Sequence, residues 1–98
     1  MTLPVRLRSE AEEDIEDAAR WYEEQQQGLG QQFLDEVMRT FDSVAEQPTM
    51  YPAVGRGAHR ALTRRFPFGV YYRIEETSVI VVAVMHGSRH PRHWKSRT

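Results

Sequence analysis

The chain has 98 residues, of which 40% are hydrophobic and 28% are charged, and it contains no cysteine. This size and composition predict one globular domain over residues 1–98 and exclude disulfide and thiolate chemistry. The N-terminal residues form no apolar secretory signal, and the longest apolar run, residues 79–85, is too short to span a bilayer. We therefore expect a cytoplasmic protein without membrane contact.

The net charge of −1 hides a strong asymmetry along the chain. Residues 1–53 carry twelve acidic and four basic side chains, whereas residues 54–98 carry two acidic and nine basic ones and all four histidines. Twelve of the thirteen cations are arginine, which suits bidentate contacts with carboxylate or phosphate. The basic half either solvates its own surface or meets an anionic partner, and the excess of arginine favours the partner.

The first predicted elements are a strand and a helix. Leu3, Val5 and Leu7 alternate with polar positions or proline, which indicates a short strand with one buried face. Ser9 is expected to cap the following helix, with Glu12 completing a capping box. An apolar stripe at helical spacing consists of Ala11, Ile15, Ala18, Ala19 and Tyr22.

A second helix follows a tight turn at Gly28-Leu29-Gly30, where Gly28 is expected to take the left-handed C-cap conformation of the first helix. It should end by Gln47, because Pro48 follows. So short a connection predicts an antiparallel helical hairpin. The apolar face of the second helix consists of Leu34, Val37, Met38, Phe41, Val44 and Ala45.

The second half of the chain predicts an irregular segment at residues 48–57 and then three strands, at residues 60–65, 70–74 and 79–85. The last strand is apolar on both faces, as a central strand should be. The order is strand, helix, helix, strand, strand, strand. This order predicts an α+β fold in which the helical hairpin packs on one face of a small, mainly antiparallel sheet.

Several short motifs spread over nearly the whole chain are typical of one protein family. They are Ala18-Ala19-Arg20-Trp21-Tyr22, Gly28-Leu29-Gly30 with Phe33, the Pro48 and Tyr51-Pro52 loop, Arg64-Arg65-Phe66-Pro67-Phe68 running into Val70-Tyr71-Tyr72-Arg73-Ile74, and Ala83-Val84-Met85-His86 followed by Arg89, Pro91 and Trp94. Together with the order of elements, they resemble the ParE/RelE toxin family. The resemblance implies a type II toxin that inhibits growth, takes part in plasmid stabilization and is neutralised by a ParD-like antitoxin in a hetero-oligomer.

The resemblance implies one of two activities. RelE-like members cut messenger RNA in the ribosome, whereas ParE-like members act on DNA gyrase and are not nucleases. Binding among ribosomal RNA phosphates requires many cations. A sequence pI near 6.4 and a single lysine, Lys95, are therefore unfavourable for that role. The ParE-like reading is therefore favoured, with no direct sequence-specific nucleic acid binding by the toxin. A ribosome-dependent endoribonuclease and an interacting protein without toxicity remain the alternatives.

Two sets of residues are candidates for binding the antitoxin. Arginines on or near the first two strands after the hairpin would dock an acidic antitoxin tail where the helices leave the sheet uncovered. Trp21 flanks the apolar stripe of the first helix, so it is expected either to complete the core, which is favoured, or to contact the antitoxin. The arginines are Arg56, Arg60, Arg64, Arg65 and Arg73.

Candidate contacts with the cellular target follow the last strand. In a nuclease, His86 would transfer protons and Arg89 would stabilise a pentavalent phosphate. Alternatively, His86 satisfies a strand-end carbonyl and Arg89 pairs with an acidic helix residue. In ParE-like toxins the C-terminal end is associated with target inhibition, and the full set is His86, Arg89, Trp94, Lys95 and Arg97.

The tail also has the spacing of a metal site at His86, His90 and His93. Pro91 disfavours the helix that would align these rings, and the tail offers no cysteine or acidic ligand. We therefore expect no metal and no cofactor.

Overall fold

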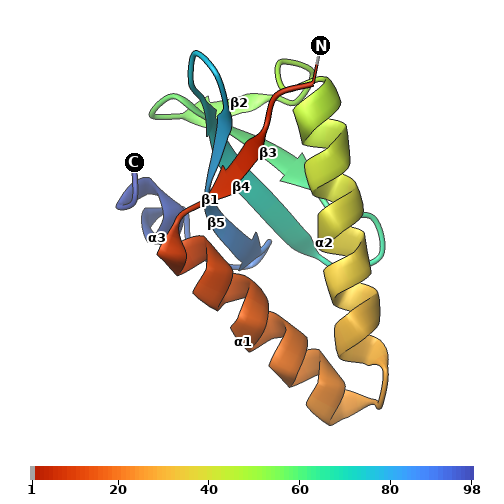
Figure 1. Cartoon of the computed structure of the whole chain (residues 1–98). Coiled ribbons are helices and arrows are strands. Elements are labelled where there is room, and N and C mark those ends of the chain that lie inside the picture. The colour runs from red at the N-terminus through yellow and green to blue at the C-terminus, as the bar shows by residue number, and fades with distance from the viewer. Residues whose placement is uncertain (1) are drawn as a thin grey trace.

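The computed structural model describes residues 2–98 and places a two-helix hairpin on one face of a five-stranded sheet (Figure 1). The strand order is β1-β5-β4-β3-β2, with β1 parallel to β5 and every other pair antiparallel. The predicted α+β class and its hairpin on a mainly antiparallel sheet are confirmed. In chain order, the elements are β1 (Val5–Leu7), α1 (Ser9–Gln25), α2 (Leu29–Glu46), β2 (Ala53–Gly55), β3 (Ala58–Leu62), β4 (Phe68–Ile74), β5 (Val79–His86) and α3 (Arg92–Lys95).

The first helix begins without the predicted capping box. Arg8 occupies the N-cap position in an extended conformation, and Ser9 is already helical, with its hydroxyl donating to the Glu10 carboxylate at 3.3 Å. The backbone N–H of Arg8 still donates to the Val81 carbonyl at 3.0 Å, so pairing with β5 continues up to the helix. The capping roles predicted for Ser9 and Glu12 are therefore wrong.

The sequence-based prediction missed two short elements, β2 and α3, and it misplaced the boundaries of β3 and β4. The edge strand β2 lies in the segment predicted to be irregular, because three residues are too few to show an alternation. The strand predicted at residues 60–65 is β3 and ends at residue 62, because Thr63 turns away. The backbone N–H of Thr63 donates to the Phe68 carbonyl at 3.0 Å, and the Thr63 hydroxyl donates to the Phe66 carbonyl. This turn also lets β4 begin at residue 68 instead of residue 70.

The turn between the helices is closed by one glutamate. Gly28 takes the predicted left-handed conformation, with φ of 88°, but it stands at the N-cap of α2, and Gly30 already lies inside that helix. The Glu23 carboxylate accepts the N–H groups of Gly28 at 2.9 Å and Gly30 at 3.0 Å. It thereby satisfies free donors at the positive end of the α2 dipole.

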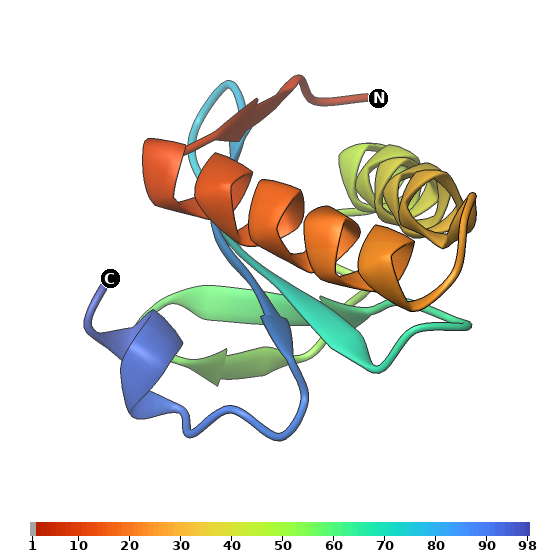
Figure 2. The same ribbon diagram turned by 90° about the horizontal axis from the view of Figure 1, so that it is seen from below.

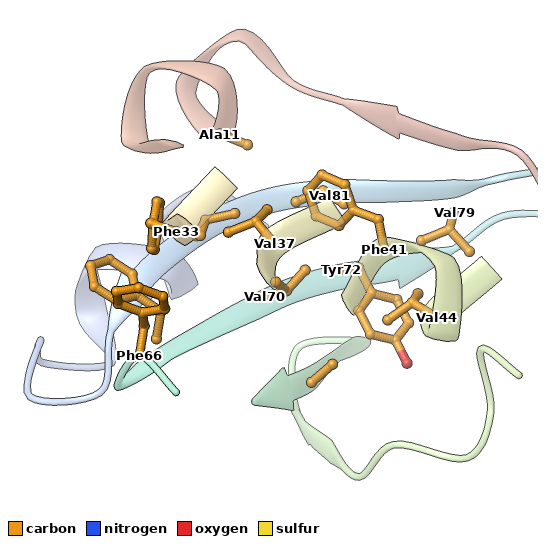
Figure 3. Packing of buried hydrophobic residues seen from close by; sticks show 13 residues of the cluster. Ala11, Phe33, Val37, Phe41, Val44, Phe66, Val70, Tyr72, Val79 and Val81 are labelled. Atoms are coloured by element: carbon orange, nitrogen blue, oxygen red, sulfur yellow. The ribbon is translucent and has the colours of Figure 1, made fainter. Parts of the chain in front are cut away.

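The main core lies between the hairpin and the sheet (Figure 3). The whole predicted stripe of α1 packs there, including Tyr22, whose ring centroid lies 5.3 Å from that of Phe33. On α2, Phe33, Val37 and Val44 are fully buried, whereas Met38 is 57% exposed. The prediction that Met38 belongs to the buried face of the second helix is wrong. Met38 lies about 100° around the helix from its buried neighbour Val37.

A second, smaller core lies on the opposite face of the sheet, where α3 folds back against it (Figure 2). Trp94 of α3 is only 4% exposed, and its indole stacks on the Tyr71 ring of β4 with centroids 4.9 Å apart. Pro91, predicted to oppose a helix here, occupies the N-cap position of α3, where its missing N–H costs no hydrogen bond. The basic tail is thus part of the fold.

Arg97 fastens this tail to α1 and β5. Its guanidinium pairs with the Asp14 carboxylate at 2.7 and 3.2 Å and donates to the Val82 carbonyl at 3.1 Å. Asp14 also accepts the N–H of Val84 at 3.0 Å, and Arg8 donates to the carbonyl of Arg97. A bidentate, mostly buried pair of this kind fixes both position and orientation. None of the helices in the described part of the chain is both long and apolar enough to cross a membrane.

Candidate functional site

The five arginines predicted to bind an antitoxin lie in two places. Arg60 stands opposite Tyr71 in the ladder between β3 and β4, and Arg73 stands opposite Ala58. Because Tyr71 and Ala58 both belong to the second core, these two arginines lie on the face of the sheet away from the helical hairpin. Arg73 donates to the carbonyl of Arg56 at 2.7 Å, so Arg56 belongs to the same group.

The arginines of this first group are held against the strands. The methylenes of Arg60 cross Gly69, where an added Cβ would lie 3.2 Å from Cγ and Cδ of Arg60. The Nε of Arg60 is buried and has no hydrogen-bond partner within residues 2–98. The guanidinium of Arg73 lies equally close to Gly57, where an added Cβ would meet it at 3.3 Å. Both side chains therefore pack on the sheet and present only part of their polar surface.

The second group, the arginine turn, consists of Arg64 and Arg65 between β3 and β4. The N–H of Arg64 donates to the Glu36 carboxylate at 3.0 Å, and the Arg65 guanidinium donates to Gln32 at 2.8 Å. Arg65 also stands over the Phe66 ring, 5.6 Å from its centroid. Both arginine side chains remain exposed. The turn is thus anchored on α2 while its charge faces solvent.

Glu36 is the buried acid that anchors the arginine turn, and no sequence pattern indicated this role. The residue is only 4% exposed, and its carboxylate also lies 3.4 Å from the Arg39 guanidinium. The backbone N–H of Arg64, followed by the Arg39 side chain, outweighs desolvation and lowers the pKa of Glu36 below its ordinary value. One carboxylate therefore holds α2 and the arginine turn together.

Replacing Glu36 by glutamine is expected to destabilise the fold by about 1–3 kcal/mol, because the charged acceptor of a partly buried N–H becomes a neutral one. Since the folded pKa is depressed, this contribution is present above the ordinary carboxyl pKa and is lost as pH falls through the folded value. Urea unfolding at about pH 7 and about pH 3 should show a smaller pH dependence in Glu36→Gln than in the wild type. The matched control is Glu46→Gln, at an exposed position of α2. An unchanged pH dependence in Glu36→Gln would contradict this role.

Four aromatic side chains line a surface hollow of about 480 Å³, here called the aromatic hollow. They are Trp21 and Tyr22 of α1, Phe68 of β4 and His86 of β5. The rings of Trp21 and Tyr22 meet edge-on with their centroids 5.2 Å apart. The rings of His86 and Phe68 also meet edge-on, with their centroids 5.5 Å apart. Trp21 is 56% exposed, so the favoured prediction that it completes the core is wrong. Tyr22 takes the core position, and its neighbour is turned toward solvent.

His86 and Arg89, the candidate catalytic pair, are engaged separately. Nδ1 of His86 accepts the N–H of Ser88 at 3.0 Å, and the Arg89 guanidinium lies 3.3 Å from Nδ1 of His93. Within residues 2–98, no side-chain hydrogen bond joins His86 to Arg89. Partial desolvation, followed by the charges of Arg89 and Arg92, lowers the pKa of His93. In the described residues, the hydrogen bond between these two residues is a backbone one, from the Arg89 N–H to the His86 carbonyl at 3.0 Å.

Three of the tail residues predicted to meet the target, Trp94, Lys95 and Arg97, make contacts within the fold. The Trp94 ring is buried on Tyr71, and the Lys95 ammonium lies 5.7 Å from the centroid of that indole. The sequence suggested an ion pair between Arg89 and an acidic residue of a helix. In the structure it is Arg97 that pairs with such a residue, Asp14 of α1. The indole therefore cannot meet a partner while the tail stays docked.

The tail histidines also have separate hydrogen bonds. Nδ1 of His90 accepts the N–H of Arg92 at 3.1 Å, while His93 contacts Arg89. Over the described residues, no three histidine, aspartate or glutamate side chains gather closely enough to hold a metal ion.

The chain is similar to proteins of type II toxin–antitoxin systems in both sequence and fold. The family model described as the ParE toxin of the type II toxin–antitoxin system parDE matches residues 5–91. The fold is similar to a chain of the chromosomal ParDE system from P. aeruginosa, with a TM-score of 0.77, 10% identity, and 87% of this chain and 96% of that chain covered. It is also similar to a chain of the RelBE2 toxin–antitoxin complex from Mycobacterium tuberculosis, with a TM-score of 0.63, 20% identity, and 88% and 99% covered. No curated protein matches the sequence.

Proposed function

We propose that this chain, which belongs to the ParE toxin family of type II toxin–antitoxin systems, arrests growth by binding DNA gyrase and not by cutting RNA. The observation that carries the proposal is that the His86 ring and the Arg89 guanidinium contact different neighbours, Ser88 and His93. Cleavage of RNA needs a proton-transfer group and a cation directed at the same phosphate. The proposal places the protein in the cytoplasm, where gyrase acts.

The distribution of charge supports a binding toxin. The pI near 6.4 and the single lysine give little of the general phosphate attraction on which RNA binding depends. The exposed charge of Arg64 and Arg65 is instead concentrated in one turn, beside an apolar surface. Such a combination suits an acidic protein partner better than a nucleic acid backbone.

The test compares two purified reactions and one growth assay. We expect the toxin to inhibit plasmid supercoiling by gyrase and to leave messenger RNA intact on translating ribosomes. His86→Ala should keep its inhibitory potency to within about tenfold, whereas loss of a catalytic acid or base typically costs about 10²–10⁴-fold in rate. Co-expression of the antitoxin, which should restore growth, is the control for specific toxicity.

Three other outcomes would each change the assignment. Cleaved transcripts with normal supercoiling, and a folded but inactive His86→Ala, would identify an endoribonuclease. Antitoxin binding without any effect on growth, gyrase or translation would identify an interacting protein that has no toxicity. Supercoiling inhibition that survives antitoxin addition would contradict neutralisation.

A further inference from the structure

We propose that the aromatic hollow and the arginine turn together form the anchor site for an acidic segment of the antitoxin that carries a large apolar side chain. This inference rests on the proposed function, because the occupant is the antitoxin of the type II pair. It assigns the centre of the interface to Trp21 and its charged rim to Arg64 and Arg65. It leaves the arginines on the outer face of the sheet outside the interface.

The two parts of the site are neighbours. A second hollow, of about 370 Å³, is formed by the arginine turn and shares Phe68 with the aromatic hollow. Gly87, which lines the second hollow, directly follows His86 of the first and donates to the Pro67 carbonyl at 2.7 Å. The rings of Phe66 and Tyr22 also connect the two, with centroids 4.8 Å apart. One continuous surface therefore runs from α1 to the β3–β4 turn.

The apolar part of this surface has the composition of an interface centre. Trp21 and Leu62 are both large hydrophobic residues and are 56% and 61% exposed, one at each hollow. Tryptophan is enriched among the residues that dominate binding energy, and exposed apolar patches mark interaction sites. The aromatic hollow falls within the size range of ordinary ligand pockets. It can therefore take a large apolar side chain from a partner.

The charge around the surface selects an acidic partner. Among residues 2–98, no acidic side chain lines either hollow, and the exposed guanidinium groups of Arg64 and Arg65 border the second one. One helical turn before Trp21, Asp17 is already paired with Arg20 at 3.1 Å. A positive rim around an apolar floor steers and orients an acidic chain.

Another apolar groove lacks the positive charge that would favour an acidic partner. It has a volume of about 340 Å³, lies between β1, α1 and α2, and has Asp42 as its one charged lining residue in the described structure. The charge of this groove therefore does not indicate which partner would bind there. The aromatic hollow, in contrast, combines Trp21 with His86, which the sequence had assigned to target binding. An antitoxin seated there covers both residues at once.

The test uses full-length toxin and the full-length antitoxin encoded beside it, with the dissociation constant measured by calorimetry. We expect Trp21→Ala to weaken binding at least about 30-fold, as for a residue at an interface centre. Arg65→Glu should weaken it about tenfold or more, and more strongly at low salt. The matched controls are Met50→Ala, at a methionine that is 60% exposed and outside both hollows, and Arg56→Glu, in the other arginine group. Both controls should stay within about threefold of the wild type.

Tryptophan fluorescence provides a direct readout. The chain has two tryptophans, and only Trp21 is exposed, since Trp94 is 4% exposed. Antitoxin binding should shift the emission to shorter wavelength and protect it from acrylamide. Trp21→Phe should bind with little loss but show neither change.

The outcomes separate this inference from the proposed function. Tight antitoxin binding with Trp21 still open to acrylamide, or with only Arg56→Glu weakened, would overturn the anchor site and leave the toxin–antitoxin pairing intact. Absence of any complex between wild-type toxin and antitoxin would overturn both. Melting curves of each variant confirm that a lost affinity reflects the surface and not the fold.

Discussion

Replacing Trp94 by alanine is expected to destabilise the fold by about 3–5 kcal/mol, because it empties the centre of the second core. The indole is 4% exposed and stacked on Tyr71, and it lies between the tail and the outer face of the sheet. For a domain of this size the loss is a large part of a total stability of about 5–15 kcal/mol. Urea unfolding measures the change directly.

The chain contains its own control for this prediction. Trp21 is the other tryptophan and is 56% exposed, so Trp21→Ala should cost about 1 kcal/mol or less. Equal losses for the two variants would mean that α3 is not docked on the sheet in solution.

The packing of the tail also affects experiments on toxicity. Deleting residues 94–98 also removes the pair between Arg97 and Asp14, so a truncated chain that loses activity reports unfolding as much as target binding.

Gly30→Ala is expected to destabilise the protein by about 2 kcal/mol, although helix propensity alone predicts the opposite sign. Alanine is favoured over glycine inside a helix by about 1 kcal/mol. A Cβ at residue 30, however, would lie 2.6 Å from the carbonyl oxygen of Ala19 and 3.0 Å from the Glu23 carboxylate. The first neighbour is backbone, so α1 and α2 must move apart, and overpacking of this kind typically costs about 1–3 kcal/mol.

Gly87→Ala is the matched control for Gly30→Ala. Its added Cβ would meet the Pro67 carbonyl at 3.5 Å, which is an ordinary contact. Thermal unfolding of both variants should show a clear drop in Tm for Gly30→Ala and a change of a few degrees at most for Gly87→Ala. A more stable Gly30→Ala would show that the hairpin opens without cost at this crossing.

Local patterns were enough to predict the hairpin and the principal strands. The stripe of α1 packs in the core as expected, and the stop at Pro48 gives a second helix that ends at Glu46. The rotation of a helix is harder to predict, because neighbouring positions at the edge of a stripe differ by about 100°. Trp21 and Met38 both lie at such edges, and the structure exposes both.

The candidate sites were predicted less well than the fold. The sequence treated five arginines as one docking surface, whereas the sheet register sends Arg60 and Arg73 to its outer face and the turn carries Arg64 and Arg65 past its end. Phe68 was part of a recognised motif, but nothing marked it as a neighbour of Trp21. Composition indicates that a chain carries many arginines, while the strand register decides which of them can face the same partner.

Local residue patterns were sufficient to identify the family, the α+β class and the order of the main elements, because these depend on residue periodicity and on motifs within short segments. Which tryptophan is buried and which charges pair depend instead on how the elements pack against one another. Asp14 and Arg97 lie 83 residues apart, and their contact exists only because β5 brings α1 and the tail together. Contacts of this kind depend on distance in space, which local periodicity does not specify.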